Sequence, residues 1–230
     1  YGLVPTMLLL TVTCANGQPQ DEVLLRPEQW AQPLTLTGVP NLHRVSPVLY
    51  RSAQPTRAGM QALKQDLGIQ TVVNLRSFHS DRDEMRGTGM AYEHITMKAW
   101  HAEEKELVRF LKIVTSPDAW PILVHCQHGA DRTGLMCAVY RVVVCDWSRE
   151  EALREMTEGG YGYHTVWVNL PRDVLHLDVA RLRRLAGIPA AGIPVPEGEA
   201  PPGSGVTPGG PLPPPSSEAR APDSGVPRQP

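Results

Sequence analysis

The sequence predicts an α/β fold in which one domain has a central, mostly parallel sheet flanked by helices. Between residues 21 and 187, β-rich runs alternate with helical patterns, as they do in layered α/β domains. Hydrophobic residues make up 41% and charged residues 20% of the 230-residue chain, which is enough for one compact core. From residue 188 onward proline, glycine and serine dominate and apolar periodicity disappears, so the domain is expected to end there.

Short β-rich runs, joined by helical patterns, are expected to form the sheet. The runs lie at 48–51, 71–75, 92–97 and 122–125. Each contains β-branched or aromatic residues, which fit a pleated, half-buried surface. Because helices lie between most of them, parallel connections are predicted.

Helical patterns fill the remaining intervals of the domain. They are expected at 56–66, 103–114, 133–145, 148–158 and 164–185. Thr56 is a suitable N-cap residue for the first, and Ser148 followed by Glu151 is typical of a capping box. The third is apolar on nearly all sides, as a buried central helix should be. Pro171 is expected to begin a new helix or kink the last pattern.

The two ends of the chain have a different character from the domain. Residues 1–20 contain a short apolar run followed by small and polar residues, which resembles the end of a secretory signal peptide. The run is too short to span a bilayer, so the mature chain is expected to lack an integral membrane segment. Export to the periplasm is the expectation, and a cytoplasmic location is the alternative. Residues 188–230 are expected to be a disordered tail.

Net charge and cysteine content narrow the possible functions. The formal net charge is −2, so nothing in the overall charge indicates nucleic acid as a partner. The 4 cysteines are too few and too irregular for a disulfide scaffold or a metal site, and no cofactor is expected. Cys137 and Cys145 lie in an apolar run and are interpreted as inert buried thiols. We expect a monomer.

One stretch of the sequence carries a recognisable chemical site. In PILVHCQHGADRTGLMCAVY, a hydrophobic strand leads into Cys126, five loop residues, Arg132 and a long apolar helix. A loop ahead of a helix N-terminus offers converging N–H groups and the positive end of the helix dipole to a phosphate. Arg132 adds a planar fork of donors. The expected phosphate-binding residues are Gln127, His128, Gly129, Ala130, Asp131, Arg132 and Thr133.

The same environment favours the thiolate form of Cys126, which would then act as a nucleophile. His125 is expected to orient the loop rather than act as a base, because an ionised thiol needs none. Thr133 can donate its hydroxyl to the sulfur when the sulfur becomes the leaving group.

The loop HCQHGADRTG resembles the HCxxGxxRTG signature of the protein tyrosine and dual-specificity phosphatase superfamily. The upstream segments LHRVSPVLYRSAQP and TVVNLR, and the later GGYGYH, are similar to compact bacterial dual-specificity phosphatases. The resemblance implies hydrolysis of phosphotyrosine, and also of phosphoserine or phosphothreonine, through a phosphocysteine on Cys126. It implies that the substrate is a phosphorylated protein or a small phosphate ester, and that no metal is required.

The general acid is the point at which the sequence departs from this family. The family usually carries an Asp on the loop after the third strand, where this chain reads MKAWHAEEKE. Glu103, Glu104 and His101 are therefore candidates, and Asp131 within the signature loop is another. Each carboxylate has a structural alternative: an acidic first helical turn for the Glu pair, and a brace of the loop for Asp131.

Several assignments remain open at the level of sequence. Arg51 and Arg76 follow strands and either contact further phosphates or lie at the surface. The aromatic residues Trp100, Tyr161 and Tyr163 either shape a substrate rim or pack in the core. An inositol polyphosphate or phosphoinositide phosphatase is the alternative enzyme, and a rhodanese-like sulfurtransferase is disfavoured by the RTG sequence. A non-catalytic phosphate-binding module is the alternative outside enzymes.

Overall fold

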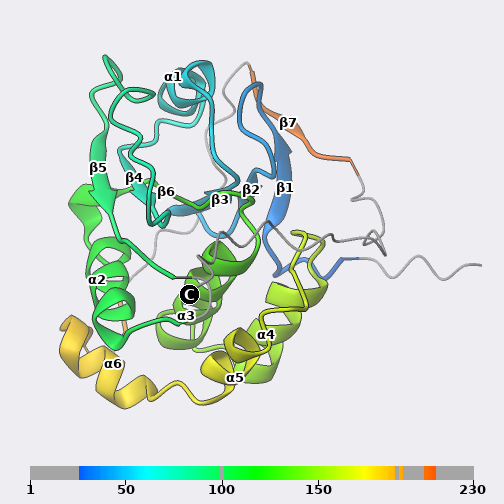
Figure 1. Cartoon of the computed structure of the whole chain (residues 1–230), viewed down its shortest axis with the longest axis vertical. Helices are drawn as coiled ribbons and strands as arrows, with labels where there is room; N and C mark the ends of the chain where they lie inside the picture. The colour runs from blue at the N-terminus through cyan, green and yellow to red at the C-terminus, as the bar shows by residue number, and fades with distance from the viewer. Residues whose placement is uncertain (1–25, 99–100, 190–191, 194–204, 211–230) are drawn as a thin grey trace, which may run out of the picture.

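The computed structural model describes residues 26–98, 101–189, 192–193 and 205–210 of the chain. The expected leader at 1–20 and Trp100 lie outside the described residues. In the described part, a sheet lies between helix α1 on one side and helices α2 to α6 on the other (Figure 1). The predicted α/β class is confirmed.

The sheet has seven strands in the order β5-β4-β6-β3-β2-β1-β7. Strands β5, β4, β6 and β3 are parallel, whereas β2, β1 and β7 continue the sheet in antiparallel pairs. The four runs predicted from the sequence form the parallel half. The strand bounds are β1 Gln32–Thr35, β2 His43–Arg44, β3 Leu49–Ser52, β4 Thr71–Asn74, β5 Ala91–His94, β6 Ile122–His125 and β7 Thr207–Pro208.

Six α-helices surround the sheet in the described residues: α1 Arg57–Asp66, α2 Glu104–Val114, α3 Asp131–Val143, α4 Arg149–Glu158, α5 Asn169–Leu175 and α6 Val179–Ala186. A short 3₁₀ helix covers Pro117–Ala119. Thr56 Oγ1 accepts a hydrogen bond from Gly59 N, and Ser148 Oγ accepts one from Glu151 N, as expected for N-caps. The last predicted helix is divided in two, with Pro171 in the first turn of α5 and Asp178 capping α6.

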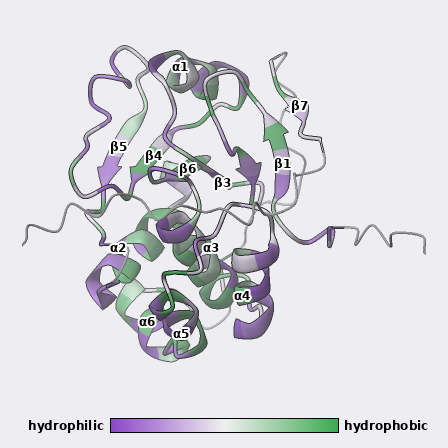
Figure 2. Ribbon diagram, turned by 45° about the vertical axis from the view of Figure 1, so that its right-hand side comes forward, coloured by the Kyte–Doolittle hydropathy of each residue, from purple (hydrophilic) through white to green (hydrophobic). Residues whose placement is uncertain are grey.

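Each face of the sheet has its own hydrophobic core. The smaller core lies under α1 and contains Met60, Leu63 and Tyr50, whereas the larger one is built around α3. Every residue of α3 from Thr133 to Val143 is buried, which matches the expected central helix. Figure 2 shows α3 below the sheet, between α2 and α4. No helix among the described residues is long and apolar enough to cross a membrane.

The tail contains ordered structure that the sequence did not indicate. Residues 207–208 form β7 and pair with Leu34 and Thr35 of β1, and Gly209 N donates to Pro33 O at 2.9 Å. Most of the expected tail, including 194–204 and 211–230, lies outside the described residues, and the strand at 207–208 is an addition to that expectation. Backbone pairing with an edge strand does not require apolar periodicity in the added segment, so composition gave no signal.

Candidate active site

Cys126 lies where the parallel strands of the sheet end. Its neighbour His125 is the last residue of β6 and is paired with Ser52 of β3 on one side and Asn74 of β4 on the other. Cys126 is 2% exposed, and the loop 127–130 turns from it into α3. The carboxyl ends of parallel strands are the usual location of ligand crevices in α/β sheets.

The loop after Cys126 can close only with glycine at position 129. Gly129 has φ +70°, and a Cβ atom there would lie 2.5 Å from the carbonyl carbon of Ser52 and 2.6 Å from Ala53 N. Both contacts are with backbone atoms, so a side chain could not be accommodated by a rotamer change. Gly129 therefore lets the loop pack directly against the end of β3.

Arg51 braces this loop from below. Its side chain is 1% exposed, its Nη2 donates to Gly129 O at 2.7 Å, and its guanidinium lies 3.5 Å from the ring centroid of Tyr161. Asn41 Nδ2 adds hydrogen bonds to His128 O at 2.9 Å and Tyr161 O at 3.0 Å. For Tyr161 the structure supports packing in the core. For Arg51 the expected surface position is wrong, because the side chain is buried and bonds to the loop carbonyls.

Arg132 and Arg76 bring two guanidinium groups beside Cys126. Arg132 Nη1 donates to Leu75 O at 3.3 Å, at the end of β4, and Arg76 Nη1 donates to Gln54 Oε1 at 2.9 Å. Partial burial, together with repulsion from Arg132, lowers the pKa of Arg76, although the charges of Asp81 and Cys126 oppose this. Two cations held this close together favour an anionic ligand.

Asp131 is held by His164 from the loop between α4 and α5. Its Oδ1 accepts from His164 N at 2.9 Å, and its Oδ2 lies 2.8 Å from His164 Nδ1. Asp131 is 7% exposed. Because both carboxylate oxygens have partners, the geometry favours the bracing role over proton donation to a substrate.

Thr133 presents a hydroxyl group that lacks a partner among the described residues. The residue is fully buried at the start of α3, and its Oγ1 makes no hydrogen bond there. An unsatisfied buried hydroxyl is costly unless a ligand or a changed charge state uses it. This position agrees with the expected role of Thr133 as a donor to the cysteine sulfur.

The remaining acid candidates lie at the start of α2. Glu103 is paired with Lys105, which lowers the pKa of its carboxyl, and Glu104 is paired with Arg181 of α6, which lowers its pKa as well. His101 is exposed and its backbone bridges to Lys98. The structure therefore turns Glu104 toward α6.

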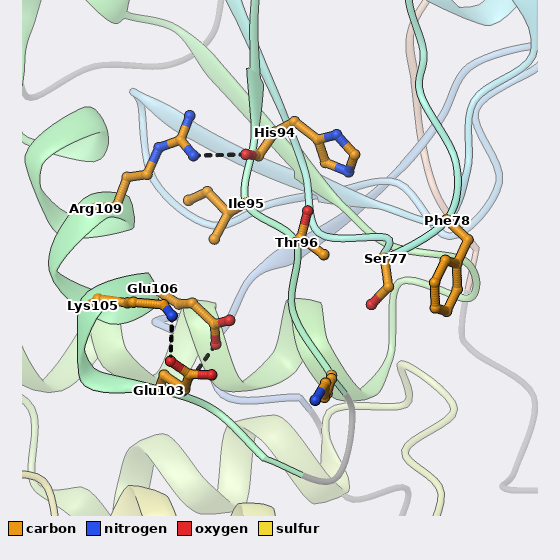
Figure 3. A pocket seen from close by; sticks show the side chains of 10 residues that line it. Ser77, Phe78, His94, Ile95, Thr96, Glu103, Lys105, Glu106 and Arg109 are labelled. Carbon is orange, nitrogen blue, oxygen red and sulfur yellow. Dashed lines mark hydrogen bonds and ion pairs between the residues drawn. The ribbon is translucent and has the colours of Figure 1, made fainter.

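Glu103 lines a cavity of about 710 Å³ next to the strand ends (Figure 3). The cavity lies between the segments that follow β4 and β5 and the first turns of α2. The residues that line it are Ser77, Phe78, His94, Ile95, Thr96, Lys98, Glu103, Lys105, Glu106 and Arg109. Phe78 is fully exposed. The signature loop does not line this cavity, so the cavity is a neighbour of the Cys126 site.

Asp81 is a site residue that sequence analysis missed. It is fully buried, and its Oδ2 lies 2.8 Å from His125 Nε2, next to the cysteine. Its Oδ1 accepts from Gln54 Nε2 at 2.8 Å. Burial raises the pKa of Asp81, but the hydrogen bonds and charges from His125 and Gln54 outweigh this and the net pKa is lowered. Asp81 stands in a polar segment rich in charges, so no pattern distinguished it.

A buried cysteine ahead of a helix N-terminus, with an arginine six residues later and a glycine packed on the neighbouring strand, defines a cysteine-dependent phosphate site. Residues 39–158 match the tyrosine phosphatase family, and this span is more than half of the chain. The chain therefore belongs to the tyrosine phosphatase family.

Among curated relatives, the dual specificity protein phosphatase TpbA of Pseudomonas aeruginosa is 39% identical over 141 residues. The match covers 60% of this chain and 62% of the relative, so the chain spans less than two thirds of that protein's length. A putative tyrosine-protein phosphatase of Debaryomyces hansenii, OCA1, is 29% identical over 126 residues, which are 48% of this chain and 64% of that protein.

Solved structures agree with the family assignment. The crystal structure of P. aeruginosa TpbA has a TM-score of 0.62 and 34% identity, covering 70% of this chain and 98% of that chain. A cysteine-to-serine variant of TpbA in complex with phosphotyrosine has a TM-score of 0.63 and 32% identity over the same shares. The catalytic domain of the Saccharomyces cerevisiae PP-IP phosphatase Siw14, at 21% identity and a TM-score of 0.60, covers 66% of this chain and 94% of that chain and shares the fold.

Proposed function

We propose that this chain is a phosphomonoesterase that hydrolyses phosphotyrosine, and also phosphoserine or phosphothreonine, through a phosphocysteine on Cys126. The observation that carries the proposal is the loop itself: Cys126 follows a buried parallel strand, Gly129 turns the loop, and Arg132 opens α3. The relatives support the same substrates, since TpbA is described as a dual specificity protein phosphatase and one of its structures holds phosphotyrosine.

The proposed reaction has two steps. In the first, the Cys126 thiolate attacks phosphorus, the bond to the leaving oxygen breaks, and a carboxylic acid supplies the proton that this oxygen gains. In the second, water attacks the phosphocysteine, the same carboxylate takes the water's proton, and the P–S bond breaks with its electron pair on sulfur. The buried Thr133 hydroxyl donates to that sulfur.

The arginine and the helix serve the transition state of both steps. Arg132 extends from the first turn of α3, where the helix dipole and free N–H groups also favour negative charge. Its planar fork can hold two equatorial oxygens of the transferred group at once. Arg51, bound to Gly129 O, keeps the loop in shape without contacting the phosphate.

We propose Glu103 as the proton donor, because the other two carboxylate candidates are engaged elsewhere. Glu103 lines a cavity that the signature loop does not reach, so Glu103 must move toward Cys126 to protonate the leaving oxygen. The structure turns Glu104 toward Arg181, and both oxygens of Asp131 are bound to His164. The ion pair with Lys105 keeps the pKa of Glu103 low, so Glu103 must leave that partner to carry a proton.

The test is hydrolysis of a small aryl phosphate and of phosphotyrosine peptides in the presence of a chelator. We expect activity that vanadate and thiol alkylation abolish, with a phosphorylated protein detected by mass spectrometry after rapid acid quenching. Cys126→Ser should remove both the activity and the phosphorylated species, whereas Cys145→Ala serves as the matched control. Activity that requires a metal and survives Cys126→Ser would contradict the proposal.

Inositol polyphosphate hydrolysis is a second candidate, which Arg76 favours. Its guanidinium lies near Arg132 and Cys126, so the site can hold more negative charge than one phosphomonoester carries. Arg76→Ala should then reduce kcat/KM for an inositol polyphosphate much more than for a nitrophenyl phosphate. Equal losses on both substrates would leave the phosphoprotein function as the supported one.

A further inference from the structure

Asp81 is an unusual residue for its location. It lies on the irregular segment between β4 and β5, yet it is fully buried. Burying a carboxylate is costly unless hydrogen bonds and an opposite charge compensate for it. The neighbouring acid Asp83 is exposed and paired with Arg86 at the surface. Of these two acids, only Asp81 points into the protein. The side chains that contact Asp81 therefore indicate its role.

The two carboxylate oxygens of Asp81 contact two different residues next to the cysteine loop, His125 and Gln54. Oδ2 lies 2.8 Å from His125 Nε2, and His125 Nδ1 lies 3.3 Å from the carbonyl oxygen of Cys126. Oδ1 accepts from Gln54 Nε2, while Gln54 N donates to Gln127 O at 3.2 Å and Gln54 Oε1 accepts from Arg76. One carboxylate thus connects the nucleophile, the loop after it and the second arginine.

The surroundings of His125 determine its protonation. The side chain is fully buried, and each ring nitrogen faces an oxygen that can only accept a hydrogen bond: the ionised Asp81 carboxylate and the Cys126 carbonyl. A neutral imidazole has one N–H group and would leave one of these contacts unmatched. The imidazolium has two and satisfies both.

We propose that Asp81 is a positioning residue that holds His125 as an imidazolium against the backbone of Cys126. This inference rests on the proposed function for its catalytic consequence, although the protonation state can be tested without it. The positive ring lies between the Asp81 carboxylate and the Cys126 carbonyl, so the ion pair directs its positive end toward the backbone of Cys126. A thiolate at Cys126 gains from this orientation, and the loop is fixed at its first peptide.

Other charged groups surround the pair and must be kept constant in a test. His79 Nε2 lies 3.4 Å from Asp81 Oδ1 and 3.5 Å from Glu84 Oε1, on the same segment as Asp81. Arg76, after β4, interacts with the charges of Asp81 and Cys126, and Arg132 faces Arg76 from α3. None of these groups bonds to His125, whose ring contacts are Asp81 and the Cys126 carbonyl.

The decisive measurement is the ¹⁵N NMR signal of the His125 ring, in the full chain at pH 7.5. We expect both ring nitrogens to be protonated in the wild type and His125 to become neutral in Asp81→Asn. The same variant should lose roughly 10- to 100-fold in kcat on an aryl phosphate with a small change in KM. Alkylation of Cys126 below neutral pH should slow down, because less thiolate is present. Asp83→Asn is the matched control and should match the wild type in every readout.

A neutral His125 ring in the wild type would overturn the proposal, whether or not Asp81→Asn folds. So would an Asp81→Asn protein with a neutral ring but unchanged kcat and alkylation rate. If the wild-type chain proved inactive on every phosphate ester, the NMR and alkylation results would still decide the inference, while the proposed function alone would fail.

Discussion

At the residue scale, the question for Arg132 is whether it acts through the planar shape of its guanidinium or only through its positive charge. Arg132 stands in the first turn of α3, and its charge interacts with that of Arg76. Arg76 already supplies positive charge to the site, so charge alone does not explain a second arginine. A planar fork, in contrast, can bind two oxygens of one phosphate at fixed angles.

We therefore expect Arg132→Lys to lose nearly as much kcat/KM as Arg132→Ala, on the order of 10²-fold or more, because an ammonium group cannot make the two-pronged contact. Steady-state kinetics on an aryl phosphate would measure this. Arg86→Lys, at an exposed position, is the control. Near-normal kcat in the Arg132→Lys protein would show that only charge matters at this position.

Glu103 should affect the rate according to the leaving group. A general acid contributes roughly 10²- to 10⁴-fold when the leaving oxygen is basic and little when it is not. Glu103→Gln is therefore expected to slow hydrolysis of alkyl phosphates far more than of nitrophenyl phosphate, whereas Glu104→Gln changes little. Asp131→Asn weakens the contact with His164 and should instead lower the rates on both substrates to a similar degree. Rates across a leaving-group series distinguish these outcomes.

The pH profile gives an independent check of the same residue. Lys105 lowers the pKa of Glu103, so Lys105→Met should let that pKa rise and extend the basic limb of the profile to higher pH. Both side chains are exposed, so the displacement should be less than about one pH unit. If the limb stays in place in Lys105→Met and persists in Glu103→Gln, Glu103 is not the proton donor.

At the element scale, a buried ion pair connects α3 to α4 and to the segment before β1. Arg141 of α3 donates from Nε to Glu155 Oε2 at 2.7 Å, and Glu155 Oε1 also accepts from Ala31 N at 2.6 Å. Both side chains are nearly fully buried. Burial raises the pKa of Glu155, but the hydrogen bonds and charge of Arg141 outweigh it, so the net pKa is lowered.

Glu155→Gln should reduce the free energy of unfolding by about 3–5 kcal/mol at pH 7, since it leaves the Arg141 charge buried without a partner. Because the folded-state pKa of Glu155 is lowered, its stabilisation is present above the unfolded value of about 4.3 and is lost as pH falls through the lower folded value. The difference between wild type and variant should therefore narrow on acidification below about pH 4. Urea melts at pH 7 and pH 3 test this, with the exposed Glu158→Gln as control.

The elements that sequence predicted well are those in which local pattern and burial agree. The run Ile122–His125 is wholly apolar up to His125 and forms β6, and the helix after it is buried on all sides, so the cysteine loop between them could be placed from sequence. The two residues of β2, His43–Arg44, carry no alternation, and their pairing is decided by β1 and β3. Asp81 was missed because its burial depends on His125, which is 44 residues away.

At the scale of the whole molecule, the sheet separates into a parallel half that carries the cysteine loop and an antiparallel half that ends at β7. Strands β3, β2 and β1 lie between β6 and β7 in the sheet order. The edge at β7 is therefore remote from Cys126 along the sheet, and changes there should affect stability without affecting catalysis.

Removal of segment 205–210 tests whether the β7 edge affects stability without affecting catalysis. The segment pairs with β1 through Thr207 and Pro208, and Val206 packs at the border of the core under α1. We expect removal of residues after 189 to cost about 1 kcal/mol, because each exposed backbone hydrogen bond contributes roughly 0.5–1.5 kcal/mol and few are lost. That corresponds to a fall in Tm of about 2–4 °C for a domain of this size. Removal of residues after 210 should leave Tm unchanged, and neither truncation should alter kcat/KM on an aryl phosphate. Equal Tm values for the two truncated proteins would show that β7 adds nothing to stability. A loss of activity only in the protein truncated after 189 would mean that segment 205–210 influences the Cys126 site across the sheet.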